Sequence, residues 1–174
     1  MIKLAVNIIT HNGLDSFILE AIKSVRNYVQ EIVVVDDGSI DDTRFVIKTE
    51  FPDAKILRRE TSHTYERAML LNDAKEITKA DWILRIDDDE IFPEETMEEI
   101  LSLDGMVPIY SIPFLHYEDE YFINPGAHKK DSFYVARLFK NIPDISWIKK
   151  EEVLAYGGRA VSSRGKQPNL CRKI

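Results

Sequence analysis

The chain has 174 residues, and 23 Lys and Arg against 30 Asp and Glu give it a formal net charge of −7, which disfavours general coating of nucleic acid. Hydrophobic residues make up 44% and charged residues 30%, which is the balance of a single globular domain and not of a disordered chain. The single cysteine, Cys171, excludes an internal disulfide and a cysteine-based zinc site.

Short apolar runs in the first half of the chain predict buried strands. Residues 4–9, 31–36 and 81–87 are rich in Val and Ile at consecutive positions, which is typical of parallel strands covered on both faces. Residues 54–57 are a weaker fourth candidate. The first run is too short to span a membrane and has no signal-peptide cleavage site, so we expect a cytoplasmic protein.

Amphipathic segments alternate with these strands and predict helices. Apolar residues recur every three or four positions in residues 14–28, and residues 41–50 follow an Asp- and Thr-rich start that can cap a helix. Residues 65–77 form a third candidate, and residues 94–103 follow Pro93, which suits a first helical turn. Such alternation predicts an α/β fold with right-handed crossovers.

The pattern changes after about residue 105. Residues 107–117 and 132–139 resemble longer strands that could form an antiparallel pair. The final residues, 156–174, carry five basic side chains and no acidic one. This segment could be a mobile tail, or it could dock on an anionic acceptor or make peripheral contact with a membrane.

Polar groups follow three of the predicted strands, at the edge where ligands bind in open α/β sheets. The first strand delivers Thr10, His11 and Asn12, the second delivers residues 36–39, and the strand that ends at Ile86 delivers residues 87–90. Clustered carboxylates are costly unless a cation offsets them, and hard oxygen ligands suit Mg²⁺ or Mn²⁺ together with a substrate phosphate. We therefore expect a metal–phosphate site at this edge, although such acids can also cap helices.

Other catalytic motifs are absent from the sequence. It has no Gly-rich dinucleotide loop, no P-loop, no His-Glu-x-x-His pair and no Gly-x-Ser-x-Gly elbow. The chain offers acids rather than a nucleophile triad.

Three linked motifs resemble glycosyltransferase family 2, whose fold is GT-A. They are NIITHNG at 7–13, IVVVDDGSIDDT at 32–43 and ADWILRIDDDEIFPEE at 80–95. RLF at 137–139 followed by WIKKEEV at 147–153 further resembles the branch of lipopolysaccharide-core glucosyltransferase-like proteins. The resemblance implies one GT-A domain over residues 1–155, with a mostly parallel central sheet, helices on both faces and a small antiparallel element. Residues 1–100 would be the donor half and 101–155 a reduced acceptor half.

The same resemblance implies roles for individual residues at the nucleotide-sugar donor. The residues that contact the donor would be Thr10, His11, Asn12, Asp37, Arg67, Asp87 and Asp88. His11 takes the position that is commonly Tyr, stacked on the base, and Asp37 would accept the N3–H of a uracil. Asp87 and Asp89 form the Asp-x-Asp signature that would hold Mn²⁺ or Mg²⁺.

The resemblance implies a metal-dependent, inverting transfer from a nucleotide-diphosphate donor, with a UDP-sugar favoured, to a glycan, lipid or protein acceptor. Inversion requires a general base that removes the acceptor proton. Glu151 is the first candidate and Glu152 the second, while residues 118–120 compete with them.

Three other interpretations stay open. A receiver-type signalling module also binds Mg²⁺ at strand ends, but its acidic pair ends the first strand. A nucleotidyltransferase normally carries a Gly-rich loop after the first strand. A catalytically silent protein that binds nucleotide sugars would need no general base.

Overall fold

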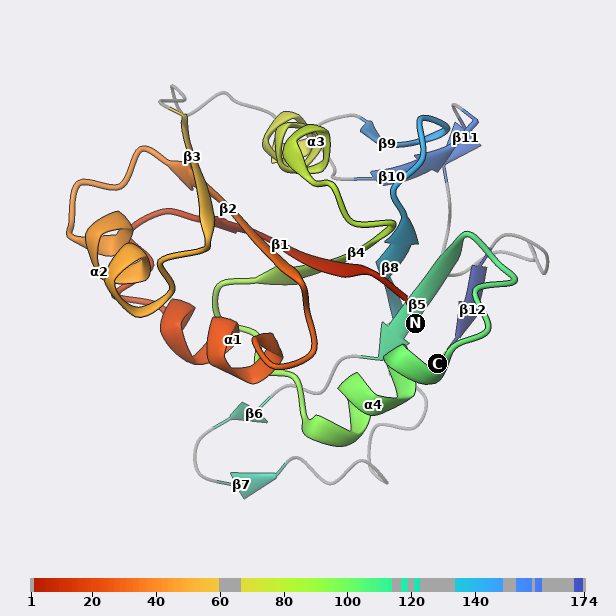
Figure 1. The fold of residues 1–174 in the computed structure, drawn as a ribbon, viewed down its shortest axis with the longest axis horizontal. Coiled ribbons are helices and arrows are strands. Elements are labelled where there is room, and N and C mark those ends of the chain that lie inside the picture. The colour runs from red at the N-terminus through yellow and green to blue at the C-terminus, as the bar shows by residue number, and fades with distance from the viewer. Residues whose placement is uncertain are drawn as a thin grey trace.

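A seven-stranded sheet forms the centre of the molecule (Figure 1). The computed structural model describes residues 2–59, 67–113, 117–118, 121–122, 134–148, 153–157, 159–160 and 171–173. The strand order is β12-β5-β8-β4-β1-β2-β3. These strands are β1 (Leu4–Thr10), β2 (Glu31–Asp37), β3 (Lys55–Arg59), β4 (Trp82–Asp87), β5 (Ile109–Pro113), β8 (Tyr134–Lys140) and β12 (Cys171–Lys173).

The first four strands run parallel, as the sequence predicts, and the weaker candidate at 54–57 is indeed a strand. Strand β8 lies antiparallel between β4 and β5, which confirms the predicted antiparallel pair. This insertion brings a strand from the second half of the chain directly beside β4.

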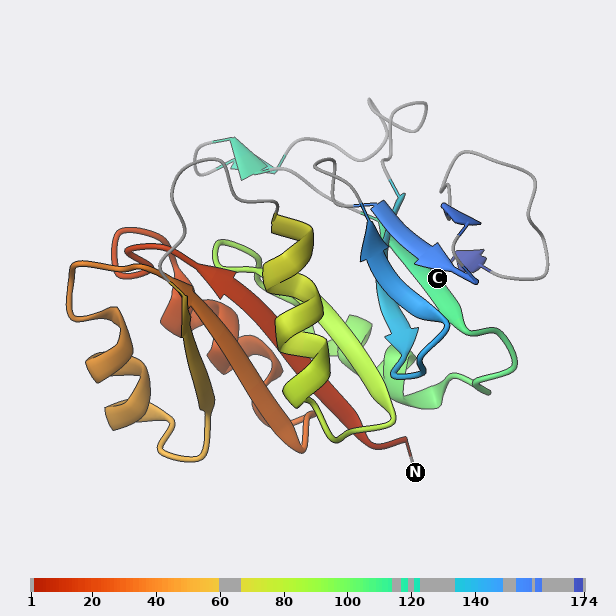
Figure 2. The ribbon, with the colours of Figure 1, turned by 90° about the horizontal axis from the view of Figure 1, so that it is seen from above.

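Helices cover both faces of the sheet (Figures 1 and 2). One face carries α1 (Ile18–Val25), α2 (Thr43–Glu50) and α4 (Glu94–Ser102), and the other carries α3 (Arg67–Ile77). Beside α3 lies an antiparallel sheet of β9 (Ile145–Ile148), β10 (Val153–Tyr156) and β11 (Arg159–Ala160). Strands β6 (Tyr117–Glu118) and β7 (Tyr121–Phe122) form a separate pair. The mostly parallel α/β architecture with a small antiparallel element is therefore confirmed.

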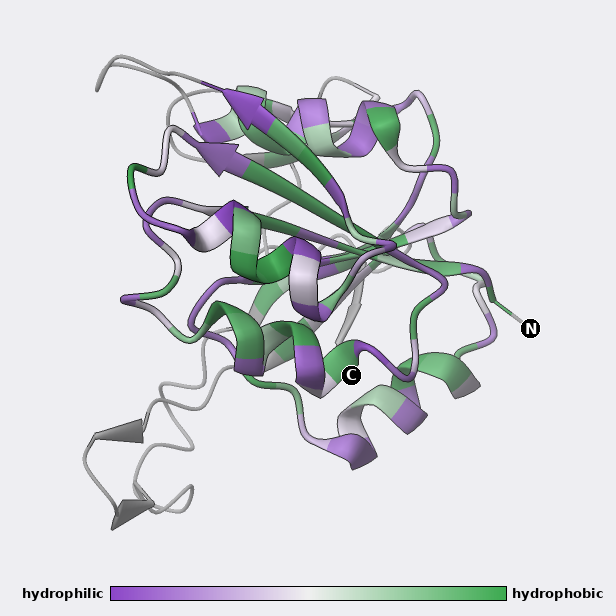
Figure 3. Ribbon diagram, turned by 60° about the vertical axis from the view of Figure 1, so that its left-hand side comes forward, coloured by the Kyte–Doolittle hydropathy of each residue, from purple (hydrophilic) through white to green (hydrophobic). Residues whose placement is uncertain are grey.

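Alternate residues of the central strands supply two hydrophobic cores, one on each face of the sheet. The central strands are accordingly coloured mostly as hydrophobic in Figure 3. Leu4 and Ile8 pack toward α1, whereas Ile9 and Val33 pack toward α3. Every residue of β1 is buried. Because side chains alternate along a strand, consecutive apolar residues are required where both faces are covered.

Helix α1 is shorter than the predicted segment 14–28. The chain turns after Asn12, which adopts a left-handed backbone with a φ of 53°. The Asp15 N–H donates to the Asn12 carbonyl at 3.0 Å to close this turn, the Leu14 N–H donates to the Thr43 hydroxyl, and α1 begins only at Ile18. Leu14 and Phe17 are consequently exposed, although their spacing matched the helical stripe. Local periodicity missed this turn because one of its hydrogen-bond partners is Thr43, the first residue of α2.

The other helices follow the predictions closely. Helix α2 begins at Thr43, whose backbone N–H donates to the Asp41 carboxylate at 3.1 Å. Helix α4 follows Pro93 as expected. Residues 65 and 66 of the third predicted helix lie outside the described part of the chain.

Asn72 joins α3 to the three-stranded sheet. Its amide nitrogen donates to the Trp147 carbonyl at 2.9 Å, and its amide oxygen accepts the Trp147 backbone N–H at 2.9 Å. Trp147 lies on the edge strand β9, and the Asn72 side chain binds the two backbone groups of Trp147 that a neighbouring strand would otherwise bind.

Strands β11 and β12 come from the segment predicted as a basic tail, and they pair with β10 and β5. The other residues from 158 onward lie outside the described part. The division into a donor half and an acceptor half stays a prediction. No helix among the described residues has the length and apolarity needed to cross a membrane.

We expect Asn72→Ala to destabilise the protein by about 1–3 kcal/mol, because two backbone groups of Trp147 lose their partners. Urea unfolding followed by circular dichroism measures this change. Asp73→Ala is the matched control, since it removes only an exposed ion pair with Arg59 and should cost at most about 1 kcal/mol. Equal losses of unfolding free energy in the two variants would contradict the role of Asn72 in joining α3 to β9.

Candidate functional site

The carboxyl ends of β1, β2 and β4 meet at one edge of the sheet, as predicted. The pairing places Thr10 beside Asp36 and Ile9 beside Asp87. Polar groups that are distant in sequence are therefore neighbours at this edge.

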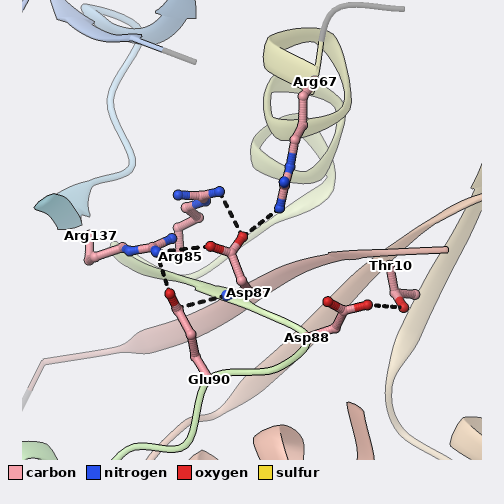
Figure 4. Close-up of polar contacts among 7 residues, drawn as sticks. All are labelled: Thr10, Arg67, Arg85, Asp87, Asp88, Glu90 and Arg137. Atoms are coloured by element: carbon pink, nitrogen blue, oxygen red, sulfur yellow. Dashed lines mark hydrogen bonds and ion pairs between the residues drawn. The ribbon is translucent and has the colours of Figure 1, made fainter. Parts of the chain in front are cut away.

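Thr10 and Asp88 are in direct contact. The Thr10 hydroxyl donates to the Asp88 carboxylate at 2.6 Å (Figure 4). Burial raises the pKa of Asp88, and the charges of Asp89 and Asp87 raise it further, against the lowering effect of the Thr10 bond. The space for this contact depends on Gly13, because a Cβ there would lie 2.3 Å from the Thr10 hydroxyl oxygen.

The loops after β1 and β2 are bound to each other. The Asn12 backbone N–H donates to the Ser39 hydroxyl at 2.8 Å, and the Asn12 amide oxygen accepts the Ile40 N–H at 3.0 Å. The Nδ1 atom of His11 lies 2.7 Å from the Asp37 carbonyl oxygen. His11 is exposed and Asp37 half-buried, so the predicted base contacts sit together at an open edge.

Asp36 stabilises the turn that follows β2, a role that the sequence did not single out. Its side chain is fully buried, and one oxygen accepts the Ser39 N–H at 3.1 Å. The other oxygen lies 3.1 Å from Nε of Arg44, in an ion pair that is not aligned as a hydrogen bond. Asp36 thus fixes the turn that presents Asp37 and Ser39.

Three arginines surround Asp87 (Figure 4). Arg67 from α3 and Arg85 from β4 donate to its Oδ1 atom, the latter at 2.7 Å. Arg137 from β8 donates to Oδ2 at 2.9 Å. Burial raises the pKa of Asp87, but the three guanidinium groups outweigh it and leave the pKa below its ordinary value.

Glu90 contacts both Asp87 and Arg137. Its carboxylate accepts the Asp87 backbone N–H at 2.8 Å and also binds the Arg137 guanidinium. Burial and the charge of Asp87 raise the pKa of Glu90 to about 7, although Arg137 acts in the opposite direction. Among the described residues, three guanidinium groups therefore contact one ionised acid and one acid whose pKa lies near neutral pH.

The donor set for a divalent cation at this edge consists of carboxylates. The Asp89 side chain is exposed beside the cluster. Mg²⁺ and Mn²⁺ need few protein ligands because they keep waters and share the phosphates of a substrate, so Asp89 fits such an ion. The structure forms no group of three or more His, Cys, Asp or Glu ligands within its described ranges. Both oxygens of Asp87 accept from arginine, so a metal contact at Asp87 would share an oxygen with a guanidinium group.

Several predicted residues come together, and others fall outside the described ranges. Thr10, His11, Asn12, Asp37, Arg67, Asp87 and Asp88 all lie at this edge. Glu151 and Glu152, with Asp119 and Glu120, are not described, nor is the side chain of Glu118.

Sequence reasoning placed Glu90 among the acids at this edge but missed Arg85 and Arg137 as parts of the cluster. Arg85 interrupts an apolar strand two residues before Asp87, on the same side of β4, and this placement was the available signal. Arg137 opens the RLF motif at 137–139, but its contact with Asp87 could not be predicted because it depends on how β8 pairs with β4.

Comparison with known proteins gives a consistent family match. The model described as glycosyl transferase family 2 matches residues 5–105. The SPbeta prophage-derived glycosyltransferase SunS of Bacillus subtilis is 30% identical over 95 residues, which are 55% of this chain and 22% of that protein. A glycosyltransferase of Rickettsia typhi is 34% identical over 105 residues, covering 58% and 32%. This chain thus matches about a fifth to a third of the length of these curated relatives.

Solved structures share the fold. S. aureus TarS 1–349 in complex with UDP has a TM-score of 0.65 and 19% identity, covering 86% of this chain and 51% of that chain. Glucosyl-3-phosphoglycerate synthase from Mycobacterium tuberculosis in complex with Mn²⁺, UDP and glucosyl-3-phosphoglycerate has a TM-score of 0.51 and 22% identity, covering 64% and 43%. These likenesses confirm the predicted GT-A-like fold.

Glu90 should make stability depend on pH. Its pKa is about 7 in the folded chain against an ordinary 4.5, so the folded state holds a proton that the unfolded state releases. This contribution is complete below about pH 4.5 and is lost as pH rises through about 7. We expect the unfolding free energy to fall over this window more steeply in the wild type than in Glu90→Gln.

Urea unfolding at pH 5, 6, 7 and 8 measures both slopes. Glu95→Gln, on the exposed side of α4, is the matched control and should keep the wild-type slope. Parallel curves for the wild type and Glu90→Gln would refute the role of Glu90.

Proposed function

The chain belongs to glycosyl transferase family 2, and on that premise we propose that it is a metal-dependent, inverting glycosyltransferase. It would transfer a sugar from a nucleotide-diphosphate donor, with a UDP-sugar favoured, to a glycan, lipid or protein acceptor. The observation that carries the proposal is the meeting of three strand ends, which gathers His11 with Asp37, Thr10 with Asp88, and Asp87 beside the exposed Asp89.

The loops after β1 and β2 would bind the base. Asp37 offers a carboxylate that can accept the N3–H of a uracil, and the exposed His11 ring beside it can stack on the base. Asn12 and Ser39 hold the two loops together at 2.8 Å, so the base would meet a preformed edge. The UDP bound in TarS and in the mycobacterial synthase supports UDP as the first nucleotide to test.

The diphosphate would lie over the carboxylates that follow β4. Asp89, with Asp87 as the second candidate, would hold Mn²⁺ or Mg²⁺ through oxygen ligands. A bound cation stabilises the negative charge that develops on the leaving diphosphate. Arg67, whose side chain is 41% exposed, is the cluster's most accessible arginine and can add a contact to a phosphate oxygen.

The general base would come from the second half of the chain. Glu151 is the first candidate and Glu152 the second, and either would take the proton of the acceptor hydroxyl on the face opposite the leaving group. They follow β9, whose Trp147 ring lies over the Arg85 guanidinium at 5.6 Å. Since Arg85 in turn binds Asp87, β9 lies close to the donor carboxylates, which supports this choice.

A calorimetric titration tests the proposed donor site. We expect UDP and UDP-sugars to bind in the presence of Mn²⁺, with weaker binding of GDP- and dTDP-sugars and a marked loss of affinity in chelator. If none of these nucleotides binds in a metal-dependent way, the proposed function is wrong. Phosphorylation of Asp87 by a small phosphodonor would favour the signalling module instead.

Asp89→Asn should abolish the metal-dependent part of UDP binding, because an amide oxygen is a much poorer ligand for a hard cation than a carboxylate. The matched control is Asp81→Asn, which changes an exposed acid at the opposite end of β4. Both variants should keep the wild-type circular dichroism spectrum. Unchanged metal-dependent binding in Asp89→Asn would remove Asp89 from the metal role.

A further inference from the structure

Two buried arginines, Arg85 and Arg137, bind the same carboxylate of the Asp-x-Asp motif (Figure 4). Strands β4 and β8 pair up to Leu84 and Leu138, and each arginine is the next residue of its strand. Their side chains are only 7% and 4% exposed. Two like charges on one carboxylate repel each other, and burial adds the cost of removing each charge from water.

This arrangement is a poor solution for stability alone. Apolar side chains of similar volume often replace buried ion clusters without loss of stability. The surrounding residues Phe139 and Trp147 belong to the apolar core on this side of the sheet, so apolar partners would be compatible with the neighbourhood. The charges therefore point to a role other than holding the fold.

What the two arginines share is Asp87. Arg85 donates to one carboxylate oxygen at 2.7 Å and Arg137 donates to the other at 2.9 Å (Figure 4). A carboxylate that accepts through both oxygens is confined to one orientation. Glu90 adds to this, because it accepts the Asp87 N–H and binds Arg137.

The arginines are held in place by the second half of the chain. The Arg85 guanidinium lies 5.6 Å from the centre of the Trp147 ring, which meets Phe139 edge-on at 5.9 Å. Asn72 fixes the backbone of Trp147 through its two hydrogen bonds. Arg137 itself belongs to β8. The orientation of Asp87 thus depends on elements that follow it by 50 residues or more.

We propose that Arg85 and Arg137 are positioning residues, which orient Asp87 toward the nucleotide diphosphate of the donor without touching the donor themselves. This inference rests on the proposed function, since it concerns the same donor site. Being almost fully buried, the two arginines act through Asp87, whereas the exposed Arg67 can act directly. Their effect on donor affinity should therefore disappear when Asp87 can no longer accept from both of them.

A double-mutant cycle tests this dependence. Arg85→Lys keeps the charge but loses the planar fork, and Asp87→Asn keeps the size but loses one acceptor. We expect each single variant to weaken UDP binding in Mn²⁺ about tenfold, and the double variant to be no weaker than Asp87→Asn alone. The same cycle with Arg137→Lys should give the same result. Calorimetry measures the affinities, and thermal unfolding without ligand follows the fold.

Losses that multiply to about a hundredfold in the double variants would overturn the inference, because residues that act independently give additive free energies. Loss of UDP affinity only in proportion to a lowered unfolding temperature would also overturn it, since that is the signature of a purely structural role. Arg26→Lys, directly after α1 and in an exposed ion pair with Asp53, is the matched control and should leave UDP affinity and unfolding unchanged. A wild-type chain that binds no nucleotide would refute the proposed function and this inference together.

Discussion

The carboxylate of Asp87 connects the first half of the chain, which contains β4 and α3, with the second half, which contains β8. It ends β4, and it accepts from Arg67 on α3 and from Arg137 on β8 as well as from Arg85 on its own strand. Breaking a buried ion cluster at one member leaves the others uncompensated in a medium of low dielectric constant. The position of one side chain at the proposed donor site is consequently determined by three separate elements of the structure.

Burying these charges is unfavourable, and the residues around the cluster offset part of that free energy. Glu90 offsets part of the positive charge, and its raised pKa shows that burial still opposes a full negative charge there. Trp147 covers Arg85, and Asn72 secures Trp147 to α3. The hydrophobic cores on both faces of the sheet provide favourable free energy that offsets the burial of these polar groups.

The sequence was sufficient for the features that depend on local order. Consecutive apolar residues in β1, β2 and β4 identified buried parallel strands, and the parallel direction placed Thr10, Asp37 and Asp87 at one edge. Short-range patterns failed at Leu14, where a turn closed by the Asp15 N–H and the Asn12 carbonyl replaces the first turn of the predicted helix. They also gave no indication that Arg137 contacts Asp87, since this contact depends on the pairing of strands far apart in the chain.

By itself, the sequence determined the α/β class, the edge of the sheet that carries the polar groups, and the acids at that edge, because strand periodicity and strand direction are local properties. Only the tertiary structure decided what those acids contact. Asp88 turns to Thr10, whereas Asp87, one residue earlier, turns to three arginines, because successive side chains near a strand end point to different sides. The contact of Asp87 with Arg137 followed from the placement of β8 beside β4, a long-range pairing that local residue spacing does not encode.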